Sequence, residues 1–145
     1  MLSIYPHLAI IAKNHWGTDL IGAAMNDQPV IIVTGASQGL GAAIATCLGR
    51  VNANVVLVAR TSNMLAQTAA AVKNLGGTPL VLPADVAHAN ECSTVVHKTL
   101  KRFDRLDALV NNAGVFKPLA ATADSDPEQW RYNLEVNLLG PYTLA

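Results

Sequence analysis

Short apolar runs alternate with longer helical segments along most of this chain. Four runs are rich in aliphatic residues and predict buried strands, at residues 30–33, 54–59, 78–82 and 106–110. Four further segments predict helices, at residues 42–48, 62–75, 88–103 and from about 125 toward Gly140. Strands that alternate with helices of this length favour an α/β fold, a doubly wound parallel sheet with right-handed crossovers.

Several predicted helices carry start and stop signals. Ser62 or Asn63 can cap the second helix, and Gly76-Gly77 can end it. Before the last helix, the segment Ser125-Asp126-Pro127-Glu128 offers a cap residue, a proline at the first helical position and a capping-box glutamate.

The turn between the first strand and the first helix contains Gly35, Gly39 and Gly41. The unpaired N–H groups and the dipole of a helix N-terminus attract an anion, and glycines let a pyrophosphate approach the backbone. The order of strand, glycine turn and helix therefore predicts a dinucleotide site on a Rossmann fold. The spacing is not G-x-G-x-x-G, and no Gly-Lys-Ser/Thr follows, which disfavours a P-loop nucleotidase.

Composition narrows the class of protein. The 145 residues are 51% hydrophobic and 14% charged with a net charge of zero, which argues against a nucleic-acid or membrane-surface partner. No apolar run reaches the roughly 18 residues of a membrane span. Cys47 and Cys92 lie too far apart to suggest a metal site or a disulfide framework, and we interpret both as buried thiols of a cytoplasmic protein.

Residues 1–28 precede the first strand of this pattern. They contain an apolar stretch at 8–12, but no basic residue precedes it and no clear cleavage site follows. We therefore expect a poorly ordered N-terminal extension rather than a targeting signal, and a partial dinucleotide-binding domain at 29–145.

Polar residues follow the other strands. Arg60 comes directly after the second strand, where no carboxylate is present. A basic residue there suits the 2′-phosphate of NADP, whereas NAD calls for an acidic one.

Asp85-Val86 follows the third strand, where Asp85 could also cap the helix near His88. Asn111-Asn112-Ala113-Gly114 follows the fourth strand, at the sheet edge where such folds bind ligands. Asn137, flanked by aliphatic residues, needs hydrogen-bond partners, which a purely structural role would also explain.

Together these motifs resemble the short-chain dehydrogenase/reductase family from Pro29 onward, with its Thr-Gly-x-x-x-Gly-x-Gly and Asn-Asn-Ala-Gly patterns. The resemblance implies a carbonyl reductase or alcohol dehydrogenase that binds NADP, with NAD as the alternative. It implies that Asp85 and Val86 contact adenine and that Asn137 supports a proton relay. The implied cofactor-binding residues are Gly35, Ser37, Gln38, Gly39, Leu40, Gly41, Arg60, Asp85, Val86, Asn111, Ala113 and Gly114.

The family's catalytic tyrosine, with a lysine four residues later, has no counterpart here. Ala9 stands at that offset from Tyr5, Val136 from Tyr132, and Tyr142 is three residues from the end. The catalytic serine is also absent. We therefore expect an inactive N-terminal fragment, truncated after about four strands, whose full-length form acts on a small carbonyl or alcohol and forms homo-oligomers. The fourth strand should then be a bare sheet edge, exposing Leu109 and Val136 and lowering solubility.

Two other functions remain open. One is a non-catalytic dinucleotide-binding or interaction module, which the missing tyrosine favours. The other is a different doubly wound enzyme such as a methyltransferase, against which Arg60 and the Asn-Asn-Ala-Gly turn argue.

Overall fold

The computed structural model describes residues 9–12 and 28–145, and side chains from residue 28 onward. One sheet carries strands in the order β1-β5-β2-β3-β4. Four strands run parallel: β2 (Val30–Thr34), β3 (Asn54–Ala59), β4 (Thr78–Pro83) and β5 (Ala108–Asn111). The predicted α/β fold with a doubly wound parallel sheet is confirmed.

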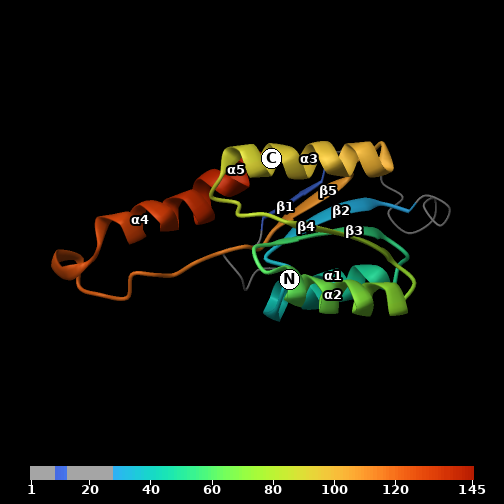
Figure 1. Cartoon of the computed structure of the whole chain (residues 1–145), viewed down its shortest axis with the longest axis horizontal. Helices are drawn as coiled ribbons and strands as arrows, with labels where there is room; N and C mark the ends of the chain where they lie inside the picture. The colour runs from blue at the N-terminus through green and yellow to red at the C-terminus, as the bar shows by residue number, and fades with distance from the viewer. Residues whose placement is uncertain (1–8, 13–27) are drawn as a thin grey trace.

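Helices cover both faces of this sheet (Figure 1). On one face lie α1 (Gly39–Gly49) and α2 (Ser62–Asn74), and on the other lies α3 (Ala89–Phe103). After β5 the chain passes through a short 3-10 turn, η1 (Thr122–Asp124), into α4 (Pro127–Leu134). A π-helical turn, η2 (Glu135–Leu139), leads into α5 (Gly140–Leu144), which returns to the side of α3.

The central strand β2 divides the core into two layers because its side chains alternate between the two faces. Val30 and Ile32 pack with residues of α3, whereas Ile31 and Val33 pack with residues of α1 and α2. Every residue of β2 is buried. Full burial of an aliphatic side chain stabilises the fold by about 1.5–3 kcal/mol, so this strand fixes where the following glycine turn lies.

Asp107 ties the first residue of β2 to the segment that enters β5. Its Oδ2 accepts a hydrogen bond of 2.8 Å from the Val30 N–H, and its own N–H donates to the Val30 carbonyl at 2.9 Å. Arg105 donates to both carboxylate oxygens at 2.8–3.2 Å. This bridge joins strands that are 77 residues apart in the chain.

We expect Asp107→Ala to lower the free energy of unfolding by about 1–2 kcal/mol, because it removes the acceptor of a partly buried N–H. Urea denaturation would measure the loss. Glu128→Ala is the control, because its ion pair with Arg131 is exposed and should be worth less than about 0.5 kcal/mol. Equal losses in the two variants would contradict the role of Asp107.

The expectation of a bare edge at the fourth predicted strand was wrong. Residues 9–12 form β1 (Ala9–Ala12), which pairs antiparallel with β5 in a register that places Ala9 opposite Asn111. Leu109 and Val136 are only 4% and 3% exposed, because both belong to the core layer that contains α3. The bare-edge argument for low solubility therefore does not hold at β5. The rest of the expected poorly ordered extension lies outside the described residues, apart from residue 28.

Some local predictions also need correction. Thr61, rather than Ser62 or Asn63, precedes the first turn of α2, and its side chain makes no capping hydrogen bond. Cys47 is exposed on α1, whereas Cys92 is buried as expected. The last predicted helix is interrupted by η2, and Pro141, which has no N–H, stands in the first turn of α5 that follows.

Two kinds of feature are absent from the part of the chain that the structure describes. None of its helices is both long enough and apolar enough to cross a membrane. Nor does any group of three or more His, Cys, Asp and Glu side chains within residues 9–12 and 28–145 have the arrangement of a metal site.

Candidate functional site

The turn after β2 is closed so tightly that side chains are excluded at two glycines. Gly35 has a φ of +65°, and a Cβ there would lie 2.8 Å from Asn112 Nδ2 and 2.9 Å from the Cα of Ala113. A Cβ on Gly41 would overlap the carbonyl oxygen of Gly35. A real Cβ carbon essentially never comes this close to another non-bonded heavy atom, so these two positions of the turn favour glycine. The result is a backbone surface with no side chain in front of it.

The N-terminus of α1 opens onto this surface with its donors available. The first N–H groups of a helix lack intrahelical acceptors, and the Gln38 side chain does not cap them. No acidic residue lies in the first turn of α1 to offset the positive end of its dipole. The geometry thus suits a phosphate group.

A buried threonine joins this turn to the one after β5. Thr34 Oγ1 accepts hydrogen bonds of 3.0 Å from the N–H groups of both Asn112 and Ala113, and donates to the Val110 carbonyl at 3.3 Å. In return, Asn112 Nδ2 donates to the carbonyl oxygens of Thr34 and Gly35 at 3.0 and 3.3 Å. The two turns therefore form one rigid floor.

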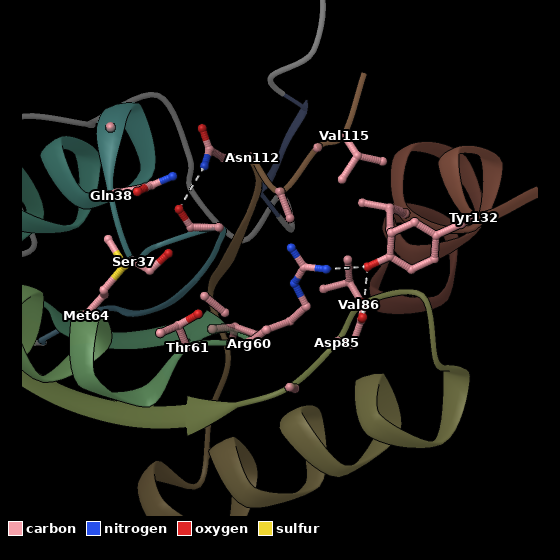
Figure 2. Close-up of a pocket in the computed structure, with 18 residues that line it drawn as sticks. Ser37, Gln38, Arg60, Thr61, Met64, Asp85, Val86, Asn112, Val115 and Tyr132 are labelled. Carbon is pink, nitrogen blue, oxygen red and sulfur yellow. Dashed lines mark hydrogen bonds between the residues drawn. The ribbon is translucent and has the colours of Figure 1, made fainter. Parts of the chain in front are cut away.

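The opposite wall is built from three elements (Figure 2). Arg60, which follows β3, extends across the cavity and donates from Nη1 to the Tyr132 hydroxyl at 2.7 Å. Tyr132, on α4, donates in turn to Asp85 Oδ2 at 2.9 Å. The side chain of Asp85 also accepts from the Ala87 N–H at 3.0 Å. Asp85 therefore stabilises its own loop and does not cap α3, whose N-cap is His88.

Charges and burial shift several pKa values near this loop. The pKa of Glu91 is lowered, first by the hydrogen bond from the Asp85 N–H and then by His88. The pKa of His88 is raised by its hydrogen bond to Glu91. Burial, followed by the hydrogen bond to Asp85, raises the pKa of Tyr132, which therefore stays protonated and able to donate at neutral pH.

These walls enclose a cavity of about 380 Å³. Its lining is Gly35, Ser37, Gln38, Gly39, Val58, Ala59, Arg60, Thr61, Met64, Ala84, Asp85, Val86, Asn112, Ala113, Gly114, Val115, Tyr132 and Val136. The lining thus comes from the carboxyl ends of β2, β3, β4 and β5, where α/β sheets place their ligand sites.

Most residues implied as cofactor-binding come together at this cavity. The structure places four of the predicted residues outside its lining: Leu40, Gly41, Asn111 and Asn137. Gly41 does not line the cavity, but its lack of a side chain lets α1 pack closely against Gly35. Asn111 is buried, and its side chain donates to the Pro141 carbonyl at 3.4 Å.

Asn137 lies in the π-helical turn η2, and every polar atom of its side chain has a partner. Its Oδ1 accepts from the Val115 N–H at 2.9 Å, and its Nδ2 donates to the Val115 carbonyl at 2.6 Å and to Asn133 Oδ1 at 2.8 Å. These contacts fix the chain that leaves the Asn-Asn-Ala-Gly turn. Its part in a proton relay stays a prediction.

Sequence reasoning missed several lining residues. Asn112 could have been found, because it stands within the Asn-Asn-Ala-Gly motif. Tyr132 gave no such signal, because nothing in the sequence tells which side of the helix 127–134 faces the cavity. Met64, Val115 and Val136 are apolar residues whose roles follow only from packing.

Comparisons with known proteins agree with this geometry. The family model described as short chain dehydrogenase matches residues 29–145. L-fucose dehydrogenase of Mus musculus is 40% identical over 115 residues, which are 79% of this chain and 41% of that protein. An 11-beta-hydroxysteroid dehydrogenase of Pinus massoniana is 32% identical over 137 residues, which are 94% of this chain and 38% of that protein. The chain thus spans about two fifths of the length of these relatives.

Solved structures give the same result. A metagenomic short-chain oxidoreductase in complex with NADP is 37% identical with a TM-score of 0.77, and the match covers 80% of this chain and 52% of that one. L-sorbose reductase from Gluconobacter frateurii, complexed with NADPH and L-sorbose, is 31% identical with a TM-score of 0.77, covering 81% of this chain and 45% of that one. The motifs, the sheet and the family match together show that the chain belongs to the short-chain dehydrogenase family.

Proposed function

We propose that this chain supplies the cofactor-binding part of an NADP-dependent short-chain oxidoreductase. The observation that carries the proposal is the uncapped N-terminus of α1, which faces a cavity closed on its other side by Arg60. The glycine turn would hold the pyrophosphate. Arg60 would bind the 2′-phosphate, because the end of β3 offers a guanidinium and no carboxylate.

The bound cofactor would supply hydride transfer to or from a small carbonyl or alcohol substrate. Asp85 and Val86 would hold the adenine, and Ala113 and Gly114 would form the floor beneath the ribose. Within the 145 residues no tyrosine has a lysine four residues later, which is the pair that would give the family's proton to the substrate oxygen. Such positioned acid–base catalysis contributes typically ~10²–10⁴-fold, and we therefore expect this chain alone to bind cofactor without turnover.

That same absence favours a second candidate function, a non-catalytic dinucleotide-binding or interaction module. Such a module would have the same cofactor site but would catalyse no reaction. Reconstituting reductase activity with a polypeptide that supplies the tyrosine and lysine would separate the two. Homo-oligomer formation by a full-length protein and a cytoplasmic location stay predictions.

Titration of the purified chain with NADPH and NADH tests the proposed function. We expect NADPH to bind more tightly, and Arg60→Asp to lower the ratio of NADPH to NADH affinity by roughly 10- to 100-fold, the equivalent of one charge-assisted hydrogen bond. Isothermal calorimetry would measure both affinities. Arg50→Asp is the matched control, because Arg50 is exposed at the far end of α1 and should leave the ratio unchanged.

Two results would contradict the proposal. One is an affinity ratio that stays the same in Arg60→Asp, which would remove Arg60 from the cofactor site. The other is tighter binding of S-adenosylmethionine than of either nicotinamide nucleotide, which would indicate a methyltransferase.

A further inference from the structure

Tyr132 occupies an unusual place between two opposite charges. It lies on α4, whereas Arg60 and Asp85 follow β3 and β4, and 72 and 47 residues of sequence separate it from them. Its hydroxyl is within 3 Å of both side chains, at 2.7 Å from Arg60 Nη1 and 2.9 Å from Asp85 Oδ2. Figure 2 shows the hydroxyl at the meeting point of the two hydrogen bonds.

The direction of each hydrogen bond follows from chemistry. A guanidinium can only donate and a carboxylate can only accept, so the single Tyr132 proton points to Asp85 and an oxygen lone pair receives Arg60. For these described side chains, the structure records no direct ion pair between Arg60 and Asp85. The tyrosine hydroxyl stands in place of that ion pair.

This arrangement determines what the guanidinium can still bind. A direct fork-to-fork pair with Asp85 would occupy two N–H groups of Arg60 and neutralise its charge. Tyr132 occupies only one N–H and brings no charge. The second amino group of Arg60 points into the cavity (Figure 2), and no hydrogen bond from it to a described residue is recorded.

We propose that Tyr132 is a positioning residue for cofactor specificity, which holds the Arg60 guanidinium apart from Asp85 so that its remaining N–H groups can bind a 2′-phosphate. The proposal rests on the proposed function and deepens it. It assigns the preference for a 2′-phosphorylated adenosine nucleotide to the pair Arg60 and Tyr132, not to Arg60 alone.

The test compares two probes that differ by one phosphate, adenosine 2′,5′-bisphosphate and adenosine 5′-monophosphate. Tyr132→Phe keeps the ring and removes the hydroxyl. We expect Tyr132→Phe to weaken binding of the bisphosphate by roughly three- to tenfold, the scale of one net hydrogen bond, and binding of the monophosphate by less than about twofold. Calorimetric titration of the full chain measures both affinities, and thermal unfolding checks that the variant is folded.

A second variant tests the reason for the loss. If Arg60 in Tyr132→Phe is captured by the Asp85 carboxylate, then adding Asp85→Asn should restore part of the preference for the 2′-phosphate, because an amide cannot neutralise the guanidinium. Recovery of the ratio of the two affinities would support the proposal even if adenine binding itself changes. A purely structural role of the hydroxyl gives no such recovery.

Controls separate this proposal from the function on which it rests. Tyr142→Phe removes a tyrosine hydroxyl that lies outside the cavity lining and should change neither affinity. If the unmodified chain binds neither probe, the proposed function and this inference both fail. If it prefers the bisphosphate but Tyr132→Phe leaves the preference intact, or weakens both probes equally, only the role of Tyr132 is overturned.

Discussion

Replacing Gly41 with alanine is expected to weaken dinucleotide binding strongly and to lower the free energy of unfolding by about 2–4 kcal/mol. The new Cβ would overlap the Gly35 carbonyl oxygen and come close to Asn112 Nδ2, so α1 must move away from the turn. That movement would displace the N–H groups that face the phosphate. Urea denaturation and NADPH titration would measure the two effects, and we expect affinity to fall by more than about 100-fold, the loss of several charge-assisted hydrogen bonds.

Gly39→Ala is the matched control for this variant. Gly39 has a φ of +56°, so alanine there is strained by ~1 kcal/mol, but its Cβ would meet no atom within 4 Å. Stability should therefore fall less than in Gly41→Ala. If the two substitutions destabilise the protein equally, backbone conformation rather than the close approach of α1 would explain the requirement for glycine.

Thr34→Val is expected to lower the free energy of unfolding by about 2–4 kcal/mol, although the two side chains have nearly the same shape. The substitution leaves the partly buried N–H groups of Asn112 and Ala113 without their acceptor, and an unsatisfied group costs about 1–3 kcal/mol when it is buried. The turn after β5 should then loosen and weaken NADPH binding. Chemical denaturation and calorimetric titration would measure both changes.

Thr34→Ser distinguishes the hydroxyl from the methyl group of the threonine. Serine retains the acceptor, so the Thr34→Ser variant should keep most of the stability and affinity that the Thr34→Val variant loses. A serine variant as unstable as the valine variant would show that packing of the methyl group, rather than the hydrogen bonds, holds the two turns together.

The parts of the fold that depend on local pattern could be predicted from the sequence. The sequence predicts a strand at 54–59, and β3 has these same bounds, because its apolar run ends abruptly at Arg60. The meeting of the glycine turn, Arg60 and Asp85 at one cavity also followed, because the carboxyl ends of parallel strands share one edge of the sheet. These inferences need only the order of elements and the direction of the strands.

Other features depend on packing between distant segments. Tyr132 reaches Arg60 and Asp85 only through the orientation of α4, which residues far from it determine. The pairing of β1 with β5 rests on four residues that precede the glycine turn, and no turn signal links them to a strand that follows 96–102 residues later. The end of the regular ladder near Gly140 did have a local signal, because Pro141 has no N–H.

The hydrogen bonds between Thr34 and Asn112 have a consequence for folding. The two residues are 78 positions apart, so a peptide that contains only one of the two turns cannot form the floor of the site. This floor should form late in folding, in the same cooperative step that brings β5 beside β2. Hydrogen exchange at the amides of Asn112 and Ala113 should accordingly report global opening of the sheet rather than local fraying of a loop.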